Sequence, residues 1–205
     1  MARRYQRQPV SQPIARGNQR RGDHVNVMSF DSWSTDTILS FGRQMVCFSS
    51  DARAIDCFDR NSGSLIWRGM TKPIHERVDY LLGIYNGILY AAGPSTILAY
   101  DLKKEGVMIW GGSSLFDGKT SCGRGMLTPD GIYVPVDEEI YKFSLLGKNG
   151  KAELVGKTTV ELGTGAPVGN LYSDGLKIWV LGGNRVYALG AKLGNDLSDN
   201  DRTGD

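Results

Sequence analysis

Two glycine-rich stretches of this chain come close to the pattern of a phosphate-binding loop. Residues 112–120 read Gly-Ser-Ser-Leu-Phe-Asp-Gly-Lys-Thr, and residues 150–158 read Gly-Lys-Ala-Glu-Leu-Val-Gly-Lys-Thr. Both hold five residues between the two glycines, whereas a phosphate-binding loop holds four. Neither is followed by a helical pattern, so the helix N-terminus that would bind the anion is not expected. We therefore interpret both stretches as connections between β-strands.

Zinc chemistry is disfavoured by the placement of the cysteine and histidine residues. The three cysteines, Cys47, Cys57 and Cys122, form no Cys-x-x-Cys pair. The two histidines, His24 and His75, lie far apart in the sequence, so a four-ligand site is not predicted. Cys47 and Cys57 fall on two strands that we expect to be neighbours. There we favour two small buried apolar side chains over a disulfide.

The carboxylates of Asp137–Glu139 form an acidic cluster that deserves comparison with a calcium site. Calcium needs several oxygen ligands that converge on one point. These three residues lie in a predicted hairpin turn, so we interpret them as a solvated loop. His75-Glu76-Arg77 is interpreted in the same way, as a polar linker, because a single histidine without a second one nearby is weak support for a general base.

Residues 1–25 form a basic arm. The arm holds six arginines against one aspartate, Asp23, whereas the other 180 residues hold 18 basic and 21 acidic groups. Such an arm could contact nucleic acid or another anionic partner. We favour a solvated tail, or an arm that wraps a neighbouring subunit, over nucleic-acid binding. The candidate contacts to an anionic partner are Arg3, Arg4, Arg7, Arg16, Arg20 and Arg21.

The elements that must position these side chains follow a repeat. Gly42, Gly87, Gly131 and Gly175 each precede a short apolar run, at spacings of 45, 44 and 44 residues. Asn or Asp stands before three of these glycines, and such dipeptides favour tight turns between strands. A second strand follows each first one, as in residues 54–58, 97–100, 140–143 and 185–189. Third strands are predicted at 64–67 and 107–110, with a weaker one at 152–155.

Four strands in about 44 residues are typical of one blade of a β-propeller. We therefore predict an all-β fold, a partial β-propeller of about four blades with up to four antiparallel strands each. The expected blades cover residues 37–70, 79–113, 124–160 and 168–190, within a region spanning 26–190. The arm at 1–25 and an acidic tail at 191–205 are expected to be disordered. An evenly spaced β-sandwich is the alternative, but a sandwich has no reason to repeat one strand order at a fixed period.

Two of the repeats resemble the quinoprotein-type (PQQ-like) propeller blade, whose signature reads Ala-x-Asp-x-x-Thr-Gly-x-x-x-Trp. Residues 57–67 match it at Asp59, Gly63 and Trp67, with Cys in place of Ala and Ser in place of Thr. The next repeat matches with one residue inserted before the glycine. It carries Asp101, Gly106 and Trp110. In the third repeat Ser144 stands where the aspartate is expected, and the tryptophan is missing.

These residue types suit a turn at a blade's outer hairpin. The aspartate can accept backbone N–H bonds, the glycine can adopt a conformation closed to other residues, and the tryptophan can wedge between blades. The resemblance also extends to the outer-membrane-assembly lipoprotein propeller, which is not an enzyme. Enzymatic members hold PQQ and calcium beside a pair of adjacent cysteines, and no Cys-Cys pair exists here. We therefore assign no catalytic, cofactor or metal residues.

The leading functional hypothesis is a non-catalytic interaction or scaffold module that belongs to a larger protein or assembly. A fragment of a PQQ-dependent oxidoreductase and a nucleic-acid-associated protein are the alternatives. The expected partners are another protein, further blades or a second copy of the chain. The sequence has no run of 18 apolar residues and no complete secretory signal, although the resemblance suggests a bacterial periplasm or cell envelope.

Overall fold

The computed structural model describes residues 38–49, 54–70, 78–112, 114–147, 149–161, 167–174, 177–182 and 185–190. The basic arm, the acidic tail and the His75-Glu76-Arg77 linker lie outside these residues. The described segments form β-strands joined by turns, with one short 3₁₀ helix, η2 (Leu102–Lys104), and no α-helix among them. The sequence expectation of an all-β fold is therefore confirmed.

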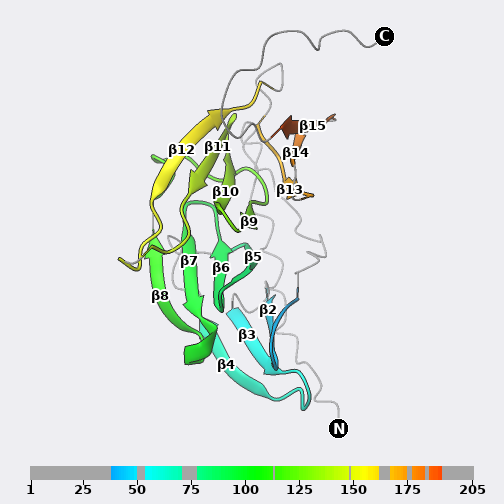
Figure 1. The fold of residues 1–205 in the computed structure, drawn as a ribbon, viewed down its shortest axis with the longest axis vertical. Helices are drawn as coiled ribbons and strands as arrows, with labels where there is room; N and C mark the ends of the chain where they lie inside the picture. The colour runs from blue at the N-terminus through cyan, green and yellow to red at the C-terminus, as the bar shows by residue number, and fades with distance from the viewer. Residues whose placement is uncertain are drawn as a thin grey trace, which may run out of the picture. The chain divides into compact units, whose positions relative to one another are not determined.

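The strands form four antiparallel sheets in chain order (Figure 1). The first sheet contains β1 (Leu39–Phe41), β2 (Gln44–Ser49), β3 (Ala54–Asp59) and β4 (Leu65–Met70). The second contains β5 (Tyr80–Tyr85), β6 (Ile88–Ala92), β7 (Ile97–Asp101) and β8 (Val107–Gly112). The third contains β9 (Met126–Thr128), β10 (Gly131–Val136), β11 (Glu139–Phe143) and β12 (Leu154–Thr159). The fourth contains β13 (Leu171–Ser173), β14 (Lys177–Gly182) and β15 (Arg185–Gly190).

Local turn chemistry explains why these strands pair as hairpins. Asn86 and Gly87, between β5 and β6, both have positive φ angles, of 52° and 80°. This pair of angles is what a tight two-residue hairpin requires, and Asn-Gly adopts it readily. In the third sheet the outer strand β12 begins at Leu154, later than the run at 152–155 predicted from the sequence. The reason is a longer turn, which Ser144 closes by donating its N–H to the Glu153 carbonyl and accepting the Glu153 N–H.

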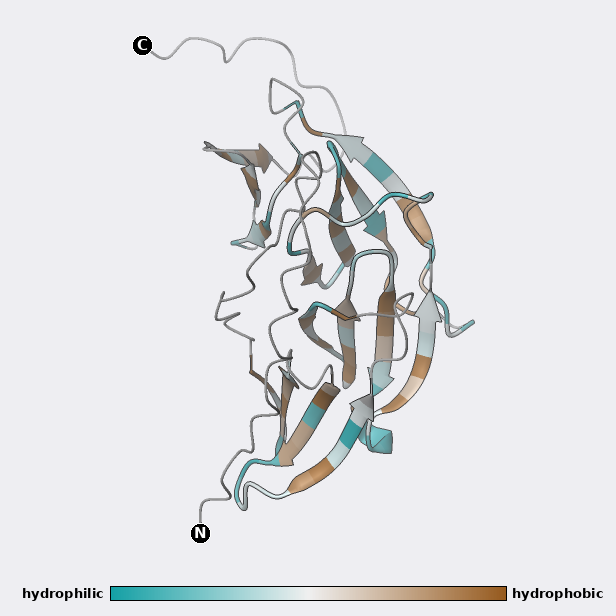
Figure 2. Cartoon of the chain, turned by 180° about the vertical axis from the view of Figure 1, so that it is seen from behind, coloured by the Kyte–Doolittle hydropathy of each residue, from teal (hydrophilic) through white to brown (hydrophobic). Residues whose placement is uncertain are grey.

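The hydrophobic core lies between consecutive sheets and not within any one of them. We call the side of a sheet that faces the next sheet in chain order its forward face, and the other side its backward face. Val46 and Ile55 on the forward face of the first sheet share a cluster with Leu89 and Leu98 of the second. Equivalent clusters join the second sheet to the third and the third to the fourth. The inner strands β6 and β7 are buried on both faces over nearly their whole length. Hydrophobic residues along the inner strands can be followed in Figure 2.

The first strands of consecutive sheets also contact one another. β1 contacts β5, β5 contacts β9, and β9 contacts β13. Meander sheets that touch through their first strands and stack face to face are blades of a β-propeller. The predicted fold class, a partial propeller of about four blades, is thus what the described residues form.

Register within the first sheet separates two of the cysteines. Val46 lies opposite Cys57, and Cys47 lies opposite Asp56. Because opposed residues share a face and neighbours along a strand alternate, Cys47 and Cys57 point to opposite sides of the sheet. Neither forms a disulfide with another described residue, and Cys122 forms none either. Burial raises the pKa of the Cys57 thiol to about 11, with a further contribution from Cys47.

Candidate binding cleft and repeat motif

The aspartates of the repeat motif organise the turns between the third and fourth strands of their blades. The Asp59 carboxylate accepts the backbone N–H groups of Asn61 and Ser62, each at 2.9 Å. These bonds, with the one from Ser62 foremost, hold the pKa of Asp59 below its usual value. Asp101 accepts the N–H of Lys103 at 2.9 Å in the corresponding turn of the second sheet. Both side chains thus serve the backbone of their own turn.

The glycines of the motif adopt the left-handed conformation. Gly63 has a φ of 68° and Gly106 has a φ of 72°. Their surroundings differ, because a Cβ built on Gly63 would meet nothing within 4 Å. A Cβ on Gly106 would lie 2.4 Å from the indole ring of Trp67. The turn of the second blade is therefore shaped to receive a side chain from the first.

Trp67 packs across the boundary between the first and second sheets. Its ring stacks on Tyr100 at a centroid distance of 6.4 Å and an interplanar angle of 17°. Its Nε1 is buried and has no hydrogen-bond partner among the described residues, so the indole acts there as an apolar plate. Trp110, the corresponding residue of the second blade, packs against the cluster between the second and third sheets.

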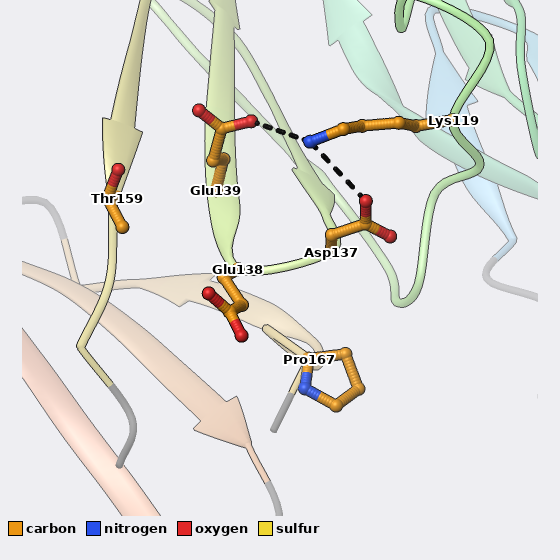
Figure 3. A pocket seen from close by; sticks show the side chains of 6 residues that line it. All are labelled: Lys119, Asp137, Glu138, Glu139, Thr159 and Pro167. Carbon is orange, nitrogen blue, oxygen red and sulfur yellow. Dashed lines mark hydrogen bonds and ion pairs between the residues drawn. The ribbon is translucent and has the colours of Figure 1, made fainter. Parts of the chain in front are cut away.

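An open cleft of about 570 Å³ lies beside the turn between β10 and β11 (Figure 3). Lys119 points into it and approaches two carboxylates, Glu139 Oε2 at 3.1 Å and Asp137 Oδ2 at 3.4 Å. The Glu139 bond is the main reason that the pKa of Lys119 is raised. The cleft is lined by Lys119, Asp137, Glu138, Glu139, Thr159 and Pro167.

Backbone hydrogen bonds fix the turn that carries the acidic side chains. Val136 pairs with Glu139, so Asp137 and Glu138 form a two-residue turn, in which Asp137 has a φ of 52°. The carbonyl of Asp137 accepts the N–H of Val168 at 2.6 Å. The carbonyl of Glu138 accepts the N–H of Val160 at 2.8 Å. The connection between β12 and β13 thereby holds the turn in place at both of its ends.

Lys119 is positioned by a buried aromatic anchor. It follows Phe116, which is fully buried and contacts the rings of Tyr141 and Phe143 edge-on at 5.8 and 6.0 Å. The Lys119 N–H also bonds to the Phe116 carbonyl at 2.9 Å. The sequence analysis placed Lys119 in a failed phosphate loop and Asp137–Glu139 in a solvated turn. No sequence signal linked the two, because their contact depends on how Phe116 anchors the connection from β8 to β9.

The second glycine-rich stretch belongs to a strand. Gly156, Lys157 and Thr158 lie in β12, where no loop can wrap a phosphate. The Lys157 ammonium pairs with Asp117 and lies 4.4 Å from the centre of the Tyr141 ring. Lys119 and Lys157, which follow the second glycine of each stretch, therefore both have carboxylate partners.

The residues present do not fit a calcium ion at the acidic turn. The Lys119 ammonium lies between Asp137 and Glu139, where a bound cation would have to sit. Among the described ranges no cluster of three His, Cys, Asp or Glu side chains has the arrangement of a metal site. The candidate arginines of the arm and both histidines lie outside those ranges. The expectation that the chain uses no cofactor stays a prediction.

A second, smaller cleft of about 290 Å³ lies where the second, third and fourth sheets meet. Arg124 donates to the Leu81 carbonyl at 3.1 Å and lies 6.0 Å from the centre of the Tyr80 ring. Its backbone N–H bonds to Asn170 at 2.7 Å. The Tyr80 hydroxyl donates to the Gly123 carbonyl and accepts the Gly125 N–H. The polar groups of Arg124, Asn170 and Tyr80 thus form hydrogen bonds that connect neighbouring blades.

Comparison with known proteins places the fold. No protein-family model and no curated protein sequence matches the chain. Among solved structures, a quinohemoprotein alcohol dehydrogenase from Pseudomonas putida aligns over 73% of this chain, at 14% identity and a TM-score of 0.55. The chain has the fold of a quinoprotein-type β-propeller. At 14% identity the likeness extends to the fold alone.

Two further propellers align less closely. BamB from Moraxella catarrhalis covers 73% of this chain at 12% identity and a TM-score of 0.49. A europium-containing methanol dehydrogenase covers 60% at 17% identity and a TM-score of 0.46. The propeller portion of this chain corresponds to 45%, 28% and 24% of the lengths of BamB, the alcohol dehydrogenase and the methanol dehydrogenase. Within the described residues no helix is long and apolar enough to cross a membrane.

Proposed function

We infer that this chain is a non-catalytic propeller module that binds another protein as part of a larger protein or assembly. The observation that carries the proposal is the cleft beside the β10–β11 turn. The backbone of this turn is fixed by hydrogen bonds from Val160 and Val168, while the Glu138 side chain remains exposed. A rigid turn that presents exposed side chains is suited to recognition, because little conformational entropy is lost when it binds.

The charge of the cleft indicates the chemistry of the partner segment. Three carboxylates face one ammonium, Lys119, so the lining carries a net charge of −2. Lys119 neutralises Asp137 and Glu139 in part, whereas the exposed Glu138 carboxylate forms no ion pair with any other described residue. A partner loop that carries lysine or arginine complements this surface, and rim charges of this kind mainly set the association rate and the specificity.

Site-specific photocrosslinking tests the proposal. The full chain carries benzoylphenylalanine in place of Glu138, or in place of Asn61 as a control, and is irradiated in cells that produce the protein. Asn61 is exposed in the β3–β4 turn and does not line the cleft. We expect one discrete protein adduct from position 138, competed by salt, and none from position 61. Equal adduct patterns at the two positions, or no adduct at 138, would contradict the proposal.

The quinoprotein alternative has its own test. The chain is incubated with PQQ and calcium, and the quinone absorbance and dye-linked oxidation of alcohols and sugars are recorded. We expect no retained chromophore after gel filtration and no oxidation. If the chain retained one quinone per molecule, the proposal of a non-catalytic interaction module would be wrong and a cofactor-binding function would take its place.

Two other expectations are tested separately. Deleting residues 1–25 tests nucleic-acid binding. Binding through the arm should weaken with added salt and should be lost when the arm is deleted. We also place the protein in a bacterial periplasm or cell envelope, on the resemblance alone, and cell fractionation tests that placement.

A further inference from the structure

The hairpin registers allow corresponding positions of the four blades to be compared. Counted from the turn that precedes it, the second strand of each sheet starts at Gln44, Ile88, Gly131 and Lys177. The fifth residue of each strand is then Phe48, Ala92, Pro135 or Leu181. Opposite these, on the third strands, lie Ile55, Ile97, Ile140 and Val186. The first three of these aliphatic residues belong to the clusters between consecutive sheets, so this position lies on the forward face.

Burial at this position changes abruptly at the fourth sheet. Ile55 and Ile97 are fully buried and Ile140 is 4% exposed, whereas Val186 is 61% exposed. Its strand neighbour Leu181 is 36% exposed, and Tyr172 on β13 is 49% exposed. By the strand alternation Trp179 lies on this same face, opposite Tyr172. The fourth sheet therefore carries aromatic and aliphatic side chains on a forward face that has no sheet packed against it among the described residues.

The three interfaces inside the molecule show what kind of surface covers a forward face. In each of them the cover is the backward face of another sheet, with apolar residues at fixed register positions. In the second sheet these include Leu89 and Tyr100, and in the third they include Ile132 and Phe143. The matching positions of the first sheet are Met45 and Phe58, which are half-buried. The first sheet thus has the side-chain pattern that a forward face requires.

We propose that the forward face of the fourth sheet (Tyr172, Trp179, Leu181, Val186 and Ala188) binds the backward face of the first sheet of a second copy of this chain. The second copy's fourth sheet would bind the first copy's first sheet in return, so two identical contacts close the pair. Two copies together hold eight such sheets, which lies within the range of about four to eight blades in closed propellers.

The ion pair on that backward face, between Asp56 and Arg68 opposite it, is compatible with being covered. Asp56 is 5% exposed and is held by Arg68 through two bonds, from Nε at 2.6 Å and from Nη2 at 2.7 Å. Docking a sheet over this face would mainly cover the half-exposed guanidinium of Arg68, whose charge Asp56 already compensates. This surface shares no residue with the acidic cleft, so the inference does not depend on the proposed function.

Mass measurement with matched variants tests the pairing. The full chain is analysed by size-exclusion chromatography with light scattering between about 1 and 200 μM, a range that covers ordinary dimer affinities. We expect a mass that rises toward twice the 22.4 kDa of one chain. Val186→Asp should shift the midpoint of association at least tenfold to higher concentration. Val155→Asp is the control, because Val155 is 62% exposed on β12 and lies away from the proposed contact.

Crosslinking then identifies the surface that receives Val186. A Val186→Cys variant treated with a short bismaleimide should form a link to Cys47, which lies on the first sheet's backward face, and mass spectrometry identifies the joined peptides. Val155→Cys should form no such link. A monomer at all concentrations, equal effects of the two aspartate variants, a ladder of larger masses, or a link between two copies of position 186 would each overturn the proposal. If Val186→Asp loses its circular dichroism spectrum, Tyr172→Glu on the same face replaces it.

Discussion

The contact between Trp67 and Gly106 leads to a prediction whose size follows from the geometry. Gly106→Ala introduces two costs. A non-glycine residue at a φ of 72° is in the left-handed region, which costs about 1–2 kcal/mol. The new Cβ would also lie 2.4–2.7 Å from three indole atoms of Trp67, and overpacking of this kind costs about 1–3 kcal/mol. We expect Gly106→Ala to lower the free energy of unfolding by about 2–5 kcal/mol.

The chain provides a matched control for the steric part. Gly63 occupies the same place in the turn of the first blade, with a φ of 68°, and its Cβ would meet nothing within 4 Å. Gly63→Ala should therefore cost only the backbone component, about 1–2 kcal/mol. Urea unfolding followed by circular dichroism measures both variants, with the free energy extrapolated to water.

A double-mutant cycle assigns the excess to Trp67. In a Trp67→Ala background the ring is gone, so Gly106→Ala should cost no more than Gly63→Ala does in the native background. The reasoning is refuted if the two glycine variants are equally destabilised, or if the excess at Gly106 persists without the indole. Either result would mean that the turn of the second blade is not shaped by the side chain of the first.

Three further outcomes follow from single contacts. The hydrogen bond from Lys142 lowers the pKa of Asp130 in the folded state. The ionised carboxylate therefore stabilises the fold above the unfolded-state pKa of about 3.9, and this stabilisation is lost as the pH falls below that value. The urea midpoint of Asp130→Asn should accordingly decline less between pH 6 and pH 3 than the midpoint of the native chain. Cys57, with a pKa of about 11, should react with a thiol reagent at pH 8 only after urea unfolds the protein. Arg68→Ala leaves Asp56 buried without the two hydrogen bonds from Arg68. It should lower the free energy of unfolding in urea by about 1–3 kcal/mol, which is less than for a fully buried ion pair because Arg68 is half-exposed. Arg68→Lys should restore only part of this free energy.

The sequence predicted the features of this fold that are local. Hairpin turns such as Asn86-Gly87 depend on residues next to each other, and the 44-residue spacing showed that the unit repeats. The need for glycine at 106 was also readable, but only as a backbone requirement. Its second cause is the ring of Trp67, which lies 39 residues earlier in the chain and reaches Gly106 only when two blades stack. The sequence therefore predicted that a tryptophan packs between blades, but not which residue it contacts.

The cleft was missed for a related physical reason. The sequence pattern at Asp137–Glu139 indicated a solvated turn, and a two-residue hairpin turn in isolation is indeed solvated. The backbone bonds from Val160 and Val168 come from the connection to the next blade, and the lysine comes from the connection to the previous one. Three separate segments must meet before the turn becomes a fixed, charged surface, and no spacing in the sequence encodes that meeting.

The two surfaces depend on different kinds of interaction, and this makes them separable. The cleft is held by backbone hydrogen bonds and by the buried Phe116 anchor, neither of which involves β14 or β15. The forward face of the fourth sheet depends on side chains such as Val186, whose backbone pairing with Leu181 does not change when the side chain does. Sites without shared partners act additively. Val186→Asp should therefore weaken pairing at least tenfold and leave the crosslink from position 138 intact, so each surface can fail without the other.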